Sequence, residues 1–137
     1  MVLYSEELAK TALLRSVARE AIVADTATRY WFYPATQAEA KTLIFIHGYR
    51  GNHHGLEAIA GALPDFNIVI PDLPGFGNSA PFAGEHSVEA YVEWLNKFVE
   101  HIIREQKLTV GPVLVGHSFG SIISAAFAAQ SSSISNL

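Results

Sequence analysis

The sequence predicts an α/β domain in which a mostly parallel sheet is covered by helices on both faces. Three observations support this: strand-like runs alternate with helix-like segments, the middle strand-like runs are apolar without alternation, and 50% of the 137 residues are hydrophobic. Continuous apolar strands are typical of parallel sheets buried on both sides, because right-handed crossovers place helices on each face. A chain of this length can bury a substantial core.

The chain is expected to form a single domain that starts with a helix. Residues 1–18 are assigned to this helix, with Ser5 as its N-terminal cap. Residues 19–130 are assigned to the core and residues 131–137 to a frayed polar tail. Within the core, β-rich runs predict about five strands, with antiparallel pairing allowed for the first two: 20–24, 28–33, 42–47, 67–70 and 113–115.

Helices are predicted between these strands. A short one covers residues 56–63 and ends at Pro64. The clearest one follows Ser87, a good N-cap residue, because apolar side chains from Val88 to Ile103 recur at the i, i+3, i+4, i+7 spacing. The last covers residues 119–130, where small side chains would let the helix pack closely on the sheet.

Composition excludes several classes of protein. A formal net charge of -4 gives no basic surface for nucleic acid, and the absence of cysteine rules out disulfide and thiol chemistry. No apolar run approaches the ~18 residues that span a bilayer, and the start does not resemble a signal peptide. The expectation is a soluble, cytoplasmic protein without nucleic-acid or membrane partners.

Residues 116–120, Gly-His-Ser-Phe-Gly, are the most informative segment. This G-x-S-x-G pattern lies between a predicted strand and a predicted helix, the context of a nucleophile elbow. A serine hydroxyl is a weak nucleophile, so it must be exposed beside a base and near N–H groups that stabilise an oxyanion. Ser118 is the candidate nucleophile, and the alternative is a serine in an ordinary turn.

Two further motifs precede this elbow. The segment 47–51, His-Gly-Tyr-Arg-Gly, follows the strand of residues 42–46, and a D-x-P-G-x-G-x-S loop at 72–79 follows the strand 67–70. In order and spacing, the three motifs resemble those of the α/β-hydrolase superfamily. The resemblance extends from about Arg19 to the end of the chain, and it predicts the N-terminal part of an α/β-hydrolase fold.

The resemblance also implies roles for particular residues. Ser118 would be the nucleophile, and the backbone N–H groups of Tyr49 and Phe119 would form the oxyanion hole. Residues flanking these positions would contribute to binding: His47, Gly48 and His117. The implied substrate is a small acyl compound, with no cofactor. Asp72 is expected to organise its own loop instead of acting as a catalytic acid.

The histidines do not predict a metal site. Residues 53 and 54 are expected to be exposed near the pocket mouth, and His101 on the solvent side of the helix after Ser87. A site made by the four histidines at 47, 53, 54 and 117 would lack companion carboxylates and the spacing of a zinc motif. No metal ion is therefore predicted.

No Asp, Glu or His follows Ser118 in the sequence. In the resembled family the acid and the histidine both follow the nucleophile. The expectation is a serine hydrolase of ester, amide or related acyl bonds that lacks these two groups and is inactive alone. The alternative is a non-catalytic remnant, such as a pseudoenzyme or binding subunit. An exposed fifth strand would favour self-association, or complementation by a C-terminal half.

Overall fold

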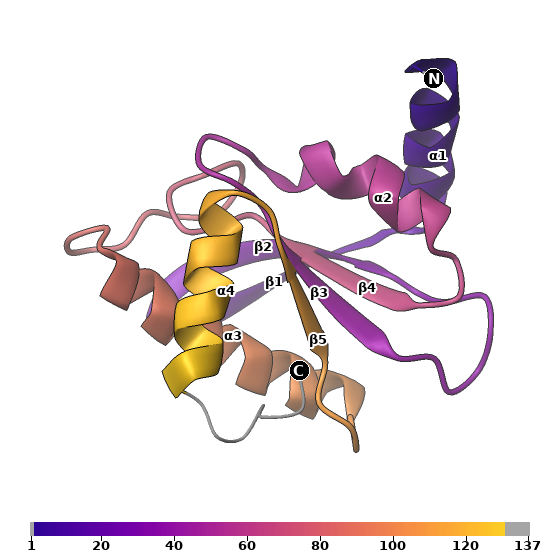
Figure 1. The fold of residues 1–137 in the computed structure, drawn as a ribbon. Coiled ribbons are helices and arrows are strands. Elements are labelled where there is room, and N and C mark those ends of the chain that lie inside the picture. The colour runs from indigo at the N-terminus through magenta and orange to yellow at the C-terminus, as the bar shows by residue number, and fades with distance from the viewer. Residues whose placement is uncertain (1, 131–137) are drawn as a thin grey trace.

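The computed structural model of the protein describes residues 2–130. Its helices and strands follow one another in the alternating order expected from the sequence (Figure 1). They are α1 (Val2–Arg15), β1 (Val17–Val23), β2 (Thr26–Tyr33), β3 (Thr42–Ile46), the 3₁₀ turn η1 (His53–Leu56), α2 (Glu57–Ala62), β4 (Asn67–Pro71), α3 (Val88–Gln106), β5 (Val113–Gly116) and α4 (Phe119–Gln130).

The five strands form one mixed sheet in the order β1-β2-β4-β3-β5. β2 pairs antiparallel with both β1 and β4, whereas β3 pairs parallel with both β4 and β5. Ile44 in β3 lies opposite Val69 on one side and Leu114 on the other. The predicted α/β sheet of about five strands is confirmed, with the antiparallel pairing allowed for the first two, but it is mixed because β2 also pairs antiparallel with β4.

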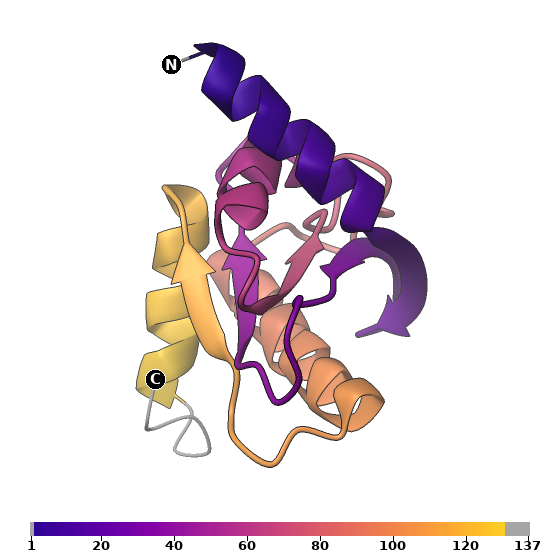
Figure 2. The ribbon, with the colours of Figure 1, turned by 90° about the vertical axis from the view of Figure 1, so that its right-hand side faces the viewer.

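Helices cover both faces of this sheet. The helices α1 and α2 pack against each other on one face, and α3 and α4 lie on the other (Figures 1 and 2). Successive strand residues point to opposite faces, so Ile44 joins the core under α3 and α4 while Phe45 joins the core under α1 and α2. Among the described helices, none is long and apolar enough to cross a membrane.

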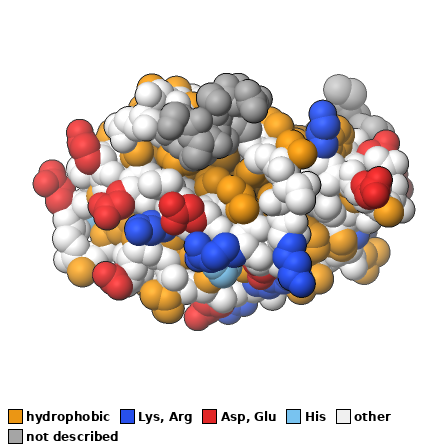
Figure 3. Space-filling model, turned by 90° about the horizontal axis from the view of Figure 1, so that it is seen from below, with side chains coloured by type: hydrophobic (Ala, Val, Ile, Leu, Met, Phe, Trp, Pro, Cys, Tyr) orange, Lys and Arg blue, Asp and Glu red, His pale blue; other side chains and the backbone are white. Residues whose placement is uncertain are grey.

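The helix α3 follows its predicted pattern. The Ser87 hydroxyl accepts a hydrogen bond from the Ala90 N–H, which confirms the predicted cap, and Lys107 ends the helix in the left-handed conformation. Within the apolar stripe, Trp94, Leu95 and Phe98 are fully buried against the sheet. On the face seen in Figure 3, side chains of both charges are interspersed, with hydrophobic side chains between them.

Three expectations differ from the structure or lie outside it. The helix α1 begins at Val2, so Ser5 lies within it and the predicted cap is wrong. His101 is half-buried, not on the solvent side, because its Nε2 lies 3.1 Å from the Tyr30 hydroxyl and its ring packs edge-on to that side chain. The predicted frayed tail, residues 131–137, lies outside the described residues.

Candidate active site

Ser118 lies in a sharp turn between strand and helix. β5 ends at Gly116 and α4 begins at Phe119, which leaves His117 and Ser118 to reverse the chain. The backbone of Ser118 has a φ of 55°, in the left-handed region that residues other than glycine seldom adopt. Such strain is typical of functional sites, and here it leaves the serine exposed at the end of the strand.

The two glycines of the motif allow α4 to approach the sheet. A Cβ atom on Gly116 would lie 2.6 Å from the Gly120 carbonyl oxygen, and one on Gly120 would collide with the Ile46 carbonyl oxygen. The His117 N–H also donates to the Ile46 oxygen at 3.0 Å. The motif therefore fixes the start of α4 against the end of β3.

The turn that follows β3 lies directly against Ser118. A Cβ atom on Gly48 would be 3.1 Å from the Cβ of Ser118. The Gly51 N–H donates a hydrogen bond of 2.9 Å to the Gly48 oxygen, which closes the turn. Among the backbone bonds of the described turns and loops, neither the Tyr49 nor the Phe119 N–H has an acceptor. These two donors belong to the segments that meet at Ser118.

His47 holds this turn from inside the protein. It is 2% exposed, its Nδ1 lies 2.8 Å from the Gly48 oxygen, and its Nε2 accepts from the Leu73 N–H at 2.9 Å. Burial lowers the pKa of His47, outweighing the opposing effects of the Gly48 bond and Asp72, so the ring is neutral at pH 7. Both ring nitrogens are used by backbone groups, and the ring ties the turn after β3 to the loop after β4.

Asp72 organises that second loop, as the sequence predicted. It is fully buried, and its carboxylate accepts from the backbone N–H groups of His53 at 2.8 Å and Asn78 at 2.9 Å. Burial by itself would raise the pKa of Asp72, but the hydrogen bonds from His53 and Asn78 outweigh it, and the pKa falls below its usual value.

His53 is buried, in contrast to the prediction for it. It is 3% exposed, its Nδ1 lies 2.9 Å from Asp72 Oδ1, and its ring stacks on Trp31 with centroids 3.2 Å apart. A carboxylate partner and an aromatic surface make burial of the imidazole favourable, and both come from distant parts of the sequence. His54 is exposed, as predicted.

An aromatic pocket adjoins the elbow. Its volume is about 410 Å³, and its lining comes from four segments: Tyr49, Gly75, Phe76, Pro81, His86, Val88, Tyr91 and Phe119. The Phe119 ring lies 5.9 Å from that of Tyr49 and 5.4 Å from that of Tyr91. Sequence reasoning missed this wall, because only the folded chain brings these segments together.

Most histidines of the described chain are committed to partners other than Ser118. The His47 ring binds the turn after β3, and the His53 ring binds Asp72. His86 Nδ1 lies 3.0 Å from the Tyr91 hydroxyl, which itself donates to the Pro74 oxygen at 2.8 Å, and His101 contacts Tyr30. The site therefore combines an exposed, strained serine, two available N–H donors and an aromatic pocket.

This arrangement agrees with the comparison of the chain with known families. Residues 41–137, more than half of the chain, match the model of a protein family described as 'alpha/beta hydrolase fold'. The chain belongs to the α/β-hydrolase family, and the resemblance carried by its three motifs is confirmed.

The relatives include hydrolases of different kinds. The chain is 35% identical over 89 residues to Lipase 3 of Moraxella sp. (strain TA144), covering 64% of this chain and 27% of that protein. It is 30% identical over 94 residues to (E)-2-((N-methylformamido)methylene)succinate hydrolase of Acinetobacter baylyi, covering 64% and 32%. The fold also matches a solved bacterial membrane phospholipase A, with a TM-score of 0.73, 26% identity, and coverage of 94% and 40%. The chain thus spans less than half the length of each.

Proposed function

We propose that this chain supplies the nucleophile and the oxyanion hole of a serine hydrolase that cleaves ester, amide or related acyl bonds. The observation that carries the proposal is the left-handed backbone of Ser118, set between glycines that tolerate no Cβ and against the turn at Gly48. A non-glycine residue adopts such a conformation where the surrounding structure imposes it, as in a nucleophile elbow.

The chemistry would begin with attack of Ser118 Oγ on the carbonyl carbon of the substrate. The negative charge that develops on the carbonyl oxygen would be bound by the N–H groups of Tyr49 and Phe119, with the N-terminal end of α4 adding a favourable dipole. Loss of the leaving group gives an acyl-serine, which water then hydrolyses. Both steps need a base, and residues 119–137 contain no histidine or carboxylate.

The aromatic pocket favours an apolar acyl group. Its volume of about 410 Å³ and its wall of Tyr49, Phe76, Tyr91 and Phe119 suit a short or medium hydrocarbon chain better than a charged one. The likeness to Lipase 3 and to the phospholipase A supports the same substrate class.

We expect a cytoplasmic enzyme whose base and acid come from a C-terminal half.

The test supplies the missing base from solution. The purified chain is incubated with p-nitrophenyl acetate, with and without imidazole, and the acetylated residue is located by mass spectrometry. Without imidazole we expect negligible turnover, because loss of triad members costs on the order of 10⁴ to 10⁶ in rate. With imidazole we expect acetylation at Ser118, absent in Ser118→Ala and unchanged in Ser16→Ala, which alters a serine in the connection between α1 and β1.

The alternative is a binding protein without catalysis that holds an apolar ligand in the aromatic pocket. Under that alternative, imidazole would not produce acetylation at Ser118, although apolar ligands could still enter the pocket. Rapid turnover without imidazole, dependent on Ser118, would instead show that a residue of this chain already serves as the base.

A further inference from the structure

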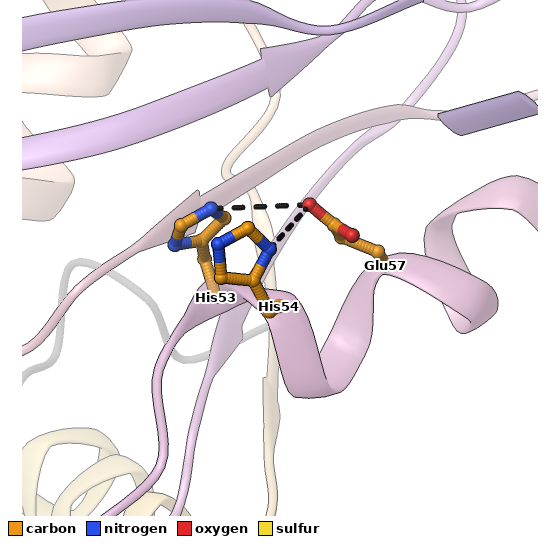
Figure 4. Close-up of side chains that lie close together, drawn as sticks. All are labelled: His53, His54 and Glu57. Atoms are coloured by element: carbon orange, nitrogen blue, oxygen red, sulfur yellow. Dashed lines mark hydrogen bonds and ion pairs between the residues drawn. The ribbon is translucent and has the colours of Figure 1, made fainter. Parts of the chain in front are cut away.

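A second cluster of reactive side chains lies away from the elbow, where η1 meets α2. His53 and His54 belong to η1, and Glu57 is the first residue of α2. One ligand atom from each lies within 4.8 Å of the other two. Figure 4 shows both imidazole rings side by side and facing the Glu57 carboxylate, whose Oε1 is 3.8 Å from His53 Nε2 and 3.0 Å from His54 Nδ1.

The partners of His53 determine which ring nitrogen holds its proton. Asp72 lies 2.9 Å from Nδ1, and an ionised carboxylate can only accept, so Nδ1 carries the hydrogen. The other ring nitrogen, Nε2, faces Glu57 Oε1, which also lies 3.0 Å from His54 Nδ1. Three ligand atoms that converge in this way can share one cation.

The distances fit a metal ion better than a proton. At 3.8 Å, His53 Nε2 and Glu57 Oε1 are too far apart for a hydrogen bond. Ligand atoms about 2.0–2.1 Å from a tetrahedral Zn²⁺ are about 3.4 Å from each other. The two separations that involve Glu57, 3.8 and 3.0 Å, lie on either side of that value, and the third, between the two histidines, is no more than 4.8 Å. A metal would therefore draw the three ligand atoms together through side-chain adjustments.

The surroundings hold the cluster in place for such an ion. Asp72 fixes the orientation of His53, in the way that carboxylates support metal-binding histidines, and Trp31 stacks on the same ring. His53 and Glu57 have side chains only 3% and 10% exposed, whereas that of His54 is 63% exposed. The cluster is thus buried on one side and open to solvent on the other.

We propose that His53, His54 and Glu57 bind a divalent transition-metal ion, with Zn²⁺ the expected occupant. Two imidazoles and one carboxylate form a typical zinc ligand set, and the solvent-facing side leaves room for a water as fourth ligand. The ion would join η1 to α2 and, through Asp72, to the loop after β4. The sequence hypothesis missed the site because it did not consider Glu57. The proposed site is independent of the role of Ser118.

The first test measures Zn²⁺ binding by titration calorimetry, using the chain without an affinity tag and after treatment with a chelator. We expect one ion per chain, with binding weakened at least about tenfold in His54→Ala and in Glu57→Gln. His54 is exposed and Glu57→Gln keeps the side-chain shape, so both variants should fold, as circular dichroism would verify. The matched control is His86→Ala, an exposed histidine outside the cluster, which should bind like the unaltered chain.

The second test uses Trp31 as a reporter. Cu²⁺ bound at His53 should quench the fluorescence of the stacked Trp31, and Zn²⁺ bound beforehand should raise the Cu²⁺ concentration needed for quenching; Trp94 lies in the opposite core. Saturating Zn²⁺ should raise the Tm by on the order of 5 °C, except in His54→Ala. Equal Zn²⁺ affinity in all variants, or no saturable binding, would overturn the proposal and leave a hydrogen-bonded cluster with a proton in place of the metal.

Discussion

The neighbouring strands β3 and β5 have similar apolar sequences but different environments. They run parallel and in register, yet all five residues of β3 are buried, whereas Val113 and Val115 of β5 are 38% and 40% exposed. β3 lies between β4 and β5, while β5 ends the sheet among the described residues. Apolar character alone therefore does not determine burial, which also needs a neighbour on each side.

The exposed side of β5 continues onto the helix that follows. Ile122 of α4 is 56% exposed, while Ile123 and Phe127 on the same helix are buried. An apolar strand and helix of this kind are typical of the middle of a sheet. Since the chain covers only 27% of the Moraxella lipase that it resembles, we expect this surface to be covered in a complete α/β-hydrolase domain.

The largest effect should come from forcing α4 away from β3. A Cβ at Gly120 would collide with the Ile46 carbonyl oxygen, so we expect Gly120→Ala to lower the free energy of unfolding by about 3 kcal/mol. Helix propensity alone would give the opposite sign, because alanine favours helices by about 1 kcal/mol over glycine. Urea denaturation distinguishes the two.

The control for this prediction is Gly84→Ala. A Cβ at Gly84 would meet no atom within 4 Å, so its effect should stay within about 0.5 kcal/mol. If Gly120→Ala were equally neutral, the close contact between α4 and the end of β3 would not be required for folding.

The same substitution in the two environments measures the contrast directly. Val69 of β4, opposite Ile44, is fully buried, so Val69→Ala should cost about 2 kcal/mol of unfolding free energy. Val115→Ala in β5 removes the same atoms from a residue that is 40% exposed and should cost less than about 1 kcal/mol. Equal costs would show that β5 is covered in solution, for example by a second copy.

The sequence predicted the parts of the molecule that depend on local pattern. The periodic apolar residues of α3, the Ser87 cap and the strand–turn–helix around Ser118 were all identified, because each depends on neighbouring residues. The roles of Tyr49 and Phe119 stay predictions, since they concern backbone groups that any residue could supply.

The sequence failed where distant segments meet. Burial of His53 requires both Trp31 from β2 and Asp72 from the loop after β4, and neither contact has a signal in the sequence near His53. The Ser5 cap failed for another reason: a good capping residue also occurs inside helices, and α1 begins at Val2.

The smallest effect on stability should come from a charge on the open strand, although its effect on association should be clear. Apolar edge strands pair with other chains, and lysine is a common means of preventing this. We therefore expect the chain to form oligomers in light scattering, and Val115→Lys to reduce the average mass while changing stability by less than about 1 kcal/mol. Val110→Lys is the matched control, because Val110 is 73% exposed but lies outside the strands.

A monomer with a cooperative melt in the unaltered chain would show that the exposed edge does not drive association. An equal decrease in mass for both variants would show that added charge, and not the β5 edge, sets the association.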